Sequence, residues 1–301
     1  MAQHQADSSS VTRQVASEGV HDWLRVATLT PIFLVILGGL YRSVLPVWVE
    51  DVWDNPNYSH AFLVPLFSGV LIWRRWGELK RLVPRGSWLG PPVILVGVGA
   101  LLLGDVGAET FLMRSSLIVI LTGLVLFHLG QEFLRLIAFP IGFLFFMVPV
   151  PAIFFYAVAF PLQTLAAQNA AWALDLLGVP VLLDGNVIHL SQLSLGVTEA
   201  CSGVRSLISL LALAVAWAYL ALPGAWGMPA LATAAVPITI LANAGRVVTT
   251  GLIGQWFGIE YARDFFHTFA GWAIFMFAFV CLLGVHGLIR LAKLSRHRNG
   301  A

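Results

Sequence analysis

Charge and cysteine are both scarce in this chain of 301 residues. Charged residues make up 11% of it, hydrophobic residues make up 58%, and its two cysteines are Cys201 and Cys281. A chain of this composition is not a soluble domain.

Several motifs with a known chemistry are also absent. The sequence has no His-Glu-x-x-His, no Cys-x-x-Cys and no tight carboxylate–histidine spacing, so we expect neither a metal site nor a bound cofactor. The missing Cys-x-x-Cys also argues against a membrane thiol–disulfide oxidoreductase. There is no internal repeat, no low-complexity tract and no phosphate-binding glycine loop, which favours a single domain.

Long hydrophobic runs dominate the chain. A helix that spans a bilayer needs about 20 largely apolar residues. Eight runs of this kind occur, at 26–47, 58–73, 89–104, 111–130, 136–160, 204–221, 228–253 and 266–289. The fifth contains Pro149-Val150-Pro151, which predicts a kink or a re-entrant break. The sequence therefore predicts an all-α polytopic membrane protein with about eight transmembrane helices. The first run is not a cleaved signal peptide, because a polar stretch of mixed charge precedes it.

The distribution of basic residues predicts the orientation of these helices. Short cytoplasmic loops are enriched in Lys and Arg. If both termini are cytoplasmic, the outer side holds only five of the 17 basic residues, namely Arg42, Arg114, Arg205, Arg246 and Arg263. We therefore expect a disordered cytoplasmic N-terminus over 1–22, one membrane-embedded domain over 23–290, and a basic cytoplasmic tail over 291–301.

Residues 161–202 form a long outer segment before the sixth run. Apolar residues at helical spacing over 162–177 predict an interfacial helix that lies on the membrane. The sequence Asp184-Gly185-Asn186 is a turn signal between two β-prone runs and predicts a small hairpin. The segment leads directly to Cys201.

Cys201 lies at the outer start of the sixth run, within Glu199-Ala200-Cys201-Ser202-Gly203-Val204-Arg205. A helix N-terminus and a nearby cation lower the pKa of a thiol, which favours a nucleophile here. The alternative is a small buried apolar cysteine. Arg205, one turn later on the same helix face, either favours the thiolate or anchors the end of the span. Cys281 lies inside the eighth run, so we expect no disulfide.

Two further polar residues are predicted at the depth of Cys201. Arg246 lies in the outer half of the seventh run, where an arginine costs about 2.5–3.5 kcal/mol and faces a partner or a wet cavity unless it snorkels to the surface. Asn243, one turn earlier, can hold its guanidinium. His267 starts the eighth run and is either functional or an interfacial anchor. His60 and Glu199 are also on the outer side, and His60 can line a substrate groove.

Five blocks of the sequence resemble the signature blocks of the exosortase/archaeosortase family. They are Asn57-Tyr58-Ser59-His60-Ala61-Phe62-Leu63-Val64-Pro65-Leu66, Met147-Val148-Pro149-Val150-Pro151, Glu199-Ala200-Cys201-Ser202-Gly203-Val204-Arg205-Ser206, Asn243-Ala244-Gly245-Arg246-Val247 and His267-Thr268-Phe269-Ala270-Gly271-Trp272. Archaeosortases commonly carry an arginine at the third site position, so His267 points to the bacterial branch. Some exosortases carry an additional C-terminal periplasmic domain, which this chain is expected to lack.

The resemblance implies a membrane cysteine transpeptidase in the bacterial inner membrane with its active site facing the periplasm. Its nucleophile would be Cys201, with Arg246 and His267 as partners. Its substrates would be exported proteins that end in a Pro-Glu-Pro motif, a transmembrane helix and a basic cluster. Besides these and the lipid bilayer we expect no nucleic-acid partner; the sequence does not indicate an oligomeric state.

The rival interpretation is a non-enzymatic membrane protein, either a transporter or an assembly factor for exopolysaccharide. A transporter places its polar residues near the bilayer midplane, often with repeat symmetry. Here the polar residues are predicted at the outer surface, and no repeat is present.

Overall fold

The structure, a computed structural model, describes residues 27–191, 193–197, 203–222, 224, 226–258 and 265–299, without the side chains of 56, 265–270 and 293–299. These residues form two compact units, one that ends at Pro151 and one that begins at Ala152. The single domain expected over 23–290 stays a prediction.

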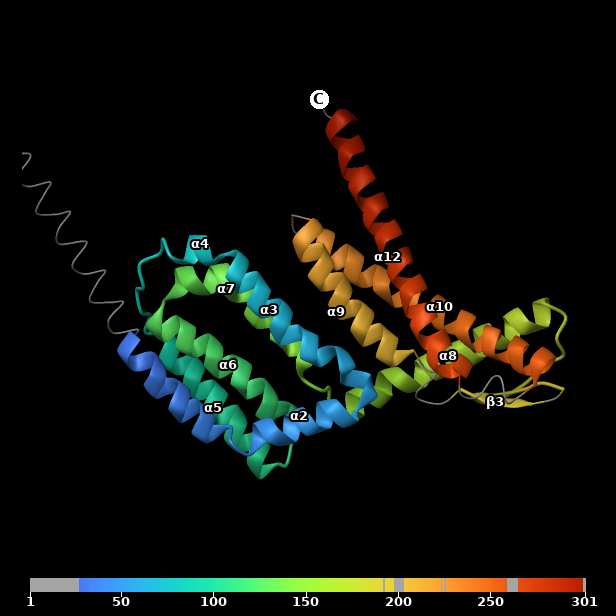
Figure 1. The fold of residues 1–301 in the computed structure, drawn as a ribbon, viewed down its shortest axis with the longest axis horizontal. Helices are drawn as coiled ribbons and strands as arrows, with labels where there is room; N and C mark the ends of the chain where they lie inside the picture. Colours follow the sequence, from blue (N-terminus) through green and yellow to red (C-terminus); the bar gives the residue numbers. More distant parts are fainter. Residues whose placement is uncertain are drawn as a thin grey trace, which may run out of the picture. The chain divides into compact units, whose positions relative to one another are not determined.

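The first unit is helical. Its elements are a helix over Ala27–Leu40, α2 (Val44–Asp54), η1 (Pro56–Phe62), α3 (Leu63–Arg74), α4 (Trp76–Leu79), α5 (Gly90–Val106), α6 (Thr110–His128), α7 (Gln131–Phe143) and η2 (Leu144–Met147). The closest packing joins α5 and α6, which form a helical hairpin (Figure 1). A Cβ added to Gly97 would lie 2.5 Å from Ile120 Cγ1, so this contact requires a residue without a side chain.

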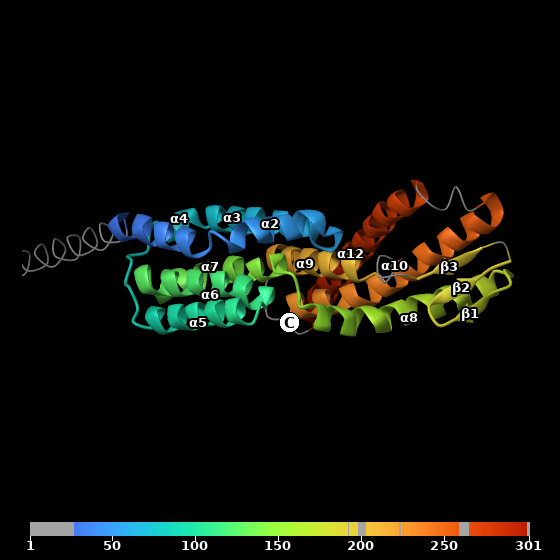
Figure 2. The same cartoon turned by 90° about the horizontal axis from the view of Figure 1, so that it is seen from below.

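The second unit combines helices with a small sheet. Its elements are α8 (Ala152–Leu176), β1 (Leu182–Asp184), β2 (Val187–His189), β3 (Ser194–Gly196), α9 (Val204–Ala221), α10 (Gly227–Phe257) and α12 (Phe265–Asn299). One core lies between α9, α10 and α12 and includes Leu210, Leu231, Ala235 and Leu282. A second core joins the C-terminal half of α8 to the sheet and to α10 (Figure 2).

The predicted hairpin is present. Strands β1 and β2 pair antiparallel with Asp184 opposite Val187, which leaves Gly185 and Asn186 as a two-residue loop. Gly185 has φ +56°, and glycine adopts positive φ without strain. β3 adds a third antiparallel strand that the sequence analysis did not predict. Alanines at 166, 167 and 170 on α8 are buried against the sheet's core, so the sheet lies close to the helix.

Helices that match membrane spans in length and hydropathy occur in both units. Within the described residues four helices are long and apolar enough to cross a membrane, at Thr110–His128, Val204–Ala221, Gly227–Phe257 and Gly271–Ala292. The number of spans rises to six if each of two helix pairs that are interrupted by a bend counts as one span. The run predicted at 204–221 coincides with α9. The chain is therefore a helical polytopic membrane protein, and the number of eight spans stays a prediction.

The expected break at Pro149 and Pro151 is present, but the helix that follows it is longer than predicted. The hydrophobic pattern predicted a span over 136–160 and a separate interfacial helix over 162–177. Instead, α8 runs without interruption from Ala152 through Pro161 to Leu176, so this boundary was wrong. A single proline removes one backbone hydrogen bond from a helix. Two prolines at 149 and 151 remove two backbone N–H donors within one turn, and the helical segment formed by α7 and η2 ends just before them.

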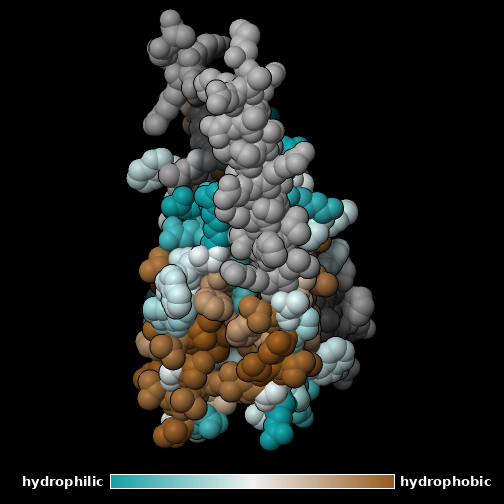
Figure 3. Space-filling model, turned by 90° about the vertical axis from the view of Figure 1, so that its left-hand side faces the viewer, coloured by the Kyte–Doolittle hydropathy of each residue, from teal (hydrophilic) through white to brown (hydrophobic). Residues whose placement is uncertain are grey.

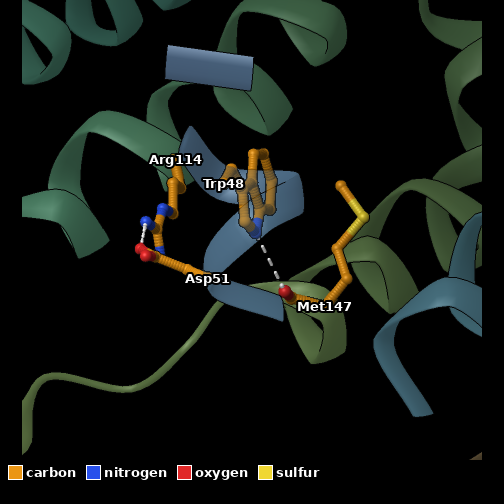
Figure 4. Close-up of polar contacts among 4 residues, drawn as sticks. All are labelled: Trp48, Asp51, Arg114 and Met147. Carbon is orange, nitrogen blue, oxygen red and sulfur yellow. Dashed lines mark hydrogen bonds and ion pairs between the residues drawn. The ribbon is translucent and has the colours of Figure 1, made fainter. Parts of the chain in front are cut away.

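Side chains from α2 and η1 bond the backbone groups at this break. Continuing the helix would leave the carbonyls of Phe145 and Met147 facing prolines, which have no N–H. Phe145 instead accepts from the Val148 N–H at 3.1 Å. The Trp48 indole N–H donates to the Met147 carbonyl at 3.3 Å (Figure 4). Buried polar backbone groups need such partners, most of all in a membrane protein.

Two residues of the block 57–66 bond the same segment. His60 Nε2 donates to the Phe146 carbonyl at 3.2 Å. The Tyr58 hydroxyl accepts the Val150 N–H at 3.0 Å. Two blocks that are far apart in the sequence, 57–66 and 147–151, are therefore in direct contact.

Trp48 also lies beside an ion pair in which the arginine is buried and the aspartate is exposed. Arg114 on α6 is 3% exposed and its guanidinium donates to the Asp51 carboxylate. The Arg114 Cζ lies 5.9 Å from the centre of the Trp48 ring, a cation–π contact. Figure 4 shows Trp48 between this pair and the Met147 carbonyl. A buried arginine needs such a partner, because an uncompensated buried charge is strongly destabilising.

We predict that Trp48→Phe destabilises the first unit. The change leaves the Met147 carbonyl without the indole N–H, which costs about 1–3 kcal/mol in free energy of unfolding. The matched control is Trp53→Phe on the same helix, where the side chain is 78% exposed and we expect a change within about 0.5 kcal/mol. Thermal unfolding of the purified protein in detergent measures both. Equal melting temperatures for the two variants would show that the indole does not support the break.

Candidate active site

The start of α9 is a left-handed turn at Gly203. Gly203 has φ +81° and ψ −1°, and its carbonyl accepts the first helical hydrogen bond, from the Leu207 N–H at 2.8 Å. An L-residue is strained in this conformation, which explains a glycine here. Helix α9 begins at Val204, and Cys201 lies outside the described residues, so the expectation that Cys201 and Arg205 share one helix face stays a prediction.

Asn243 on α10 packs directly against this turn. Asn243 is 4% exposed. A Cβ added to Gly203 would lie 3.0 Å from the Asn243 Cγ, so the glycine also allows a close approach between α9 and α10. The structure thus brings the sequence blocks around 203 and 243 into contact.

Arg246 lies one turn after Asn243 and lines a small cavity between three helices. The cavity has a volume of about 10 Å³, which is near the size that holds one water molecule. It is lined by Ser206 from α9, by Thr239, Ala242, Asn243 and Arg246 from α10, and by Gly271, Ile274, Phe275 and Ala278 from α12. Arg246 is half-buried, so the helices enclose part of a cation.

The α12 residues of this cavity form one face of the helix. Residues 271, 274, 275 and 278 are spaced by three and four positions, as on a single helix face. Position 267 precedes Gly271 by one turn within α12 and therefore belongs to that face by its backbone position. The side chain of His267 lies outside the described residues.

A second small cavity lies on the other side of Asn243. It is lined by Leu162, Ala166, Gly203, Leu207, Thr239, Ile240 and Asn243. Its volume is also about 10 Å³. Asn243 and Thr239 thus separate two cavities, and one of these cavities borders the Gly203 turn. The site residues are placed by α10, which contacts both α8 and α9.

The other predicted site residues are placed as follows. Arg205 lies in the first turn of α9 and is half-buried. A positive charge in the first turn interacts unfavourably with the helix dipole, so a role in stabilising the start of α9 does not explain an arginine at this position. His60 lies in the first unit, where its ring bonds the Phe146 carbonyl. Cys201 and Glu199 lie outside the described residues, and Cys281 is half-buried within α12.

Sequence reasoning missed Ser206 and Thr239, which line the cavity with Arg246. Thr239 is 3% exposed and its hydroxyl donates to the Ala235 carbonyl at 2.8 Å. Positions 239, 243 and 246 are spaced by four and three, so the helical period alone would have placed them on one face. In the described part of the chain no three His, Cys, Asp or Glu side chains could hold a metal ion together; with Cys201 and His267 outside it, the expected lack of a metal stays a prediction.

The fold and this arrangement define a multi-pass helical membrane protein with a polar site where three helices meet. Residues 52–284 match the family model described as transmembrane exosortase. The chain therefore belongs to the transmembrane exosortase family, which confirms the family predicted from the five sequence blocks. The comparisons with curated proteins and with solved structures found no match.

We predict that Gly203→Ala destabilises the second unit. A residue with a Cβ costs about 1–2 kcal/mol at this positive φ, and its Cβ would crowd Asn243. The control is Gly245→Ala on α10, where no atom lies within 4 Å of an added Cβ and alanine should stabilise the helix by about 0.5–1 kcal/mol. Thermal unfolding of both variants measures the difference. A Gly203→Ala protein as stable as Gly245→Ala would contradict the close contact.

Proposed function

We propose that this protein is a cysteine transpeptidase that acts by acyl transfer through a thioester. The observation that carries the proposal is the meeting of three sequence blocks around Arg246: Gly203 contacts Asn243, while Ser206 and Gly271 line the cavity next to the guanidinium. These blocks also contain Cys201 and His267. Membership in the exosortase family supports the same reaction class.

Covalent geometry limits how far Cys201 can lie from this site. Cys201 precedes Gly203 by two positions, and extended chain spans at most about 3.3–3.6 Å per residue. The Cα atoms of the two residues are thus within about 7 Å. Position 267 lies one helical turn from Gly271. This supports a site in which the Cys201 thiol, the Arg246 guanidinium and the His267 imidazole act together.

The reaction begins when the Cys201 thiolate attacks the carbonyl carbon of the scissile peptide bond. The tetrahedral intermediate collapses, the C–N bond breaks, and the leaving amine takes a proton from the His267 imidazolium. A thioester remains on Cys201. The neutral imidazole then deprotonates the incoming nucleophile, which attacks the thioester and releases the thiolate. The two steps together return Cys201 to the thiolate and His267 to the imidazolium.

Arg246 stabilises the thiolate or the oxyanion of the intermediate. A positioned cation is effective in a site from which most water is excluded, and the cavity beside Arg246 is near the size of one water molecule. The small sheet packs against α10 near Val247. Restricting water in this way favours transfer of the acyl group over hydrolysis.

The substrates are exported proteins with a C-terminal sorting signal of Pro-Glu-Pro, a transmembrane helix and a basic cluster. The enzyme resides in the bacterial inner membrane with eight transmembrane helices, both termini in the cytoplasm and the site facing the periplasm. The resemblance of the five sequence blocks motivates the substrate class, and the basic loop between α3 and α5 motivates the orientation.

We predict that Cys201→Ala abolishes processing of a sorting-signal substrate while the protein stays folded. Cys201→Ser should be nearly as inactive, because a hydroxyl lacks the accessible pKa of a thiol. Arg246→Lys should restore little activity over Arg246→Ala, because lysine keeps the charge but not the planar fork. His267→Ala should reduce processing severely.

The assay follows the size of the substrate in cells that carry each variant. Cys281→Ala is the matched control, since it makes the same change at the other cysteine, on α12, and should leave processing normal. A substrate–enzyme thioester trapped on Cys201 and mapped by mass spectrometry is the positive result. Normal processing by Cys201→Ala would refute the covalent mechanism and favour the non-enzymatic transporter or assembly factor.

The orientation generates a separate prediction. Reporter fusions after Arg81 and at the C-terminus should report a cytoplasmic location, and a fusion near Asp184 should report an external one, because short cytoplasmic loops hold the excess of basic residues. An external signal from the C-terminal fusion would place the site on the cytoplasmic side and remove the case for periplasmic substrates.

A further inference from the structure

Exposed tryptophans and basic residues gather in the segment 73–88, which we name the basic loop. It begins at the end of α3, includes α4, and ends just before α5. Trp73, Trp76 and Trp88 are 74%, 51% and 87% exposed. Arg74, Lys80, Arg81 and Arg85 are also exposed, and the Lys80 ammonium lies 5.2 Å from the centre of the Trp76 ring.

The basic loop is held against its own unit. Leu79 is 6% exposed and Pro84 is fully buried. Arg75 donates from Nη1 to the Leu136 carbonyl of α7 at 2.9 Å. The Arg85 and Ser87 N–H groups donate to the Leu129 and Leu126 carbonyls at 3.2 and 2.9 Å. The tryptophans are therefore exposed on an anchored segment, although three exposed indoles are unfavourable in water.

The charges around the basic loop are mostly positive. Arg135 on α7 is exposed as well, and the exposed acidic residues on these elements are Glu78 and Glu132. On the adjoining α3, Leu63, Leu66 and Val70 are apolar and at least half exposed, as expected of a helix that faces lipid. Figure 3 shows one face of the molecule, where hydrophilic residues lie above a mostly hydrophobic surface.

We propose that the basic loop binds the headgroups of anionic phospholipids. Tryptophan favours the membrane–water interface, where its apolar ring and its N–H are both satisfied. Lysines and arginines beside it attract phosphate groups of an anionic leaflet. The apolar helix α3 ends at Arg74, and Trp73-Arg74-Arg75-Trp76 at its end places both features at the depth of the headgroups. This inference is independent of the proposed reaction and names a lipid class that the protein selects.

The test compares the binding of two lipids to the purified full-length protein. Native mass spectrometry in detergent counts phosphatidylglycerol and phosphatidylcholine bound from an equimolar mixture. We expect the protein to prefer phosphatidylglycerol, and 0.5 M salt, by screening, to weaken that preference. In the variant R74Q/K80Q/R81Q/R85Q, which keeps the buried Leu79 and Pro84 and the bonded Arg75, affinity for phosphatidylglycerol should fall by at least about tenfold.

The matched control is R290Q/K293Q/R296Q/R298Q, which removes four basic residues from the C-terminal end of the chain. This variant should bind phosphatidylglycerol like the unmodified protein. Equal losses in the two variants would mean that net charge alone attracts the lipid, and would overturn the proposal. Equal binding of the two lipids by the unmodified protein would overturn it as well, and would favour an acidic soluble partner for the basic loop. Salt-insensitive binding would exclude a headgroup contact.

Discussion

A peptide group inside a bilayer has no water to bond, so a helix that stops there must find hydrogen-bond partners within the protein. The chain stops one helix at Pro149 and Pro151, and this constraint organises the first unit. Trp48, Tyr58 and His60 supply or accept the hydrogen bonds that a regular helix would have made. The pair of Arg114 and Asp51 packs beside Trp48. The hydrogen bonds of Trp48, Tyr58 and His60 thus meet the needs of the backbone at the break.

The main constraint in the second unit is different: a cation, Arg246, lies between apolar helices. Arg246 lies where α9, α10 and α12 meet, and the residues that line its cavity include the small or polar Gly271, Ser206 and Asn243. Small residues leave room for the guanidinium and for about one water molecule. The sheet and α8 pack on the same α10 from another direction. The position of the arginine is therefore determined by packing on several sides of one helix.

Much of the fold follows from simple patterns, and the exceptions have physical reasons. The run at 204–221 matches α9 because apolar residues fill it and Gly203, in a left-handed conformation, caps its N-terminus. The pattern at Asp184-Gly185-Asn186 identifies the hairpin, whereas Ser194-Leu195-Gly196 has no strand pattern and pairs only because β2 offers an edge. Helix α8 continues through Pro161 because one missing donor is tolerated.

At the site, the cost of an intramembrane charge identifies Arg246. Thr239 could not be identified in this way, because its hydroxyl bonds the backbone of its own helix, as threonines in many helices do. The placement of Cys201 and His267 remains a prediction.

The bonds at the break also impose an order of events during synthesis. Trp48, Tyr58 and His60 precede their partners by 99, 92 and 86 residues. At about 5–20 residues per second, the ribosome makes those partners roughly 5–20 seconds later. During that interval α2 and η1 are already made, while the carbonyls and the N–H that complete their hydrogen bonds have not been synthesised. Trp48, Tyr58 and His60 can therefore make these hydrogen bonds only after residues 146–150 have been synthesised.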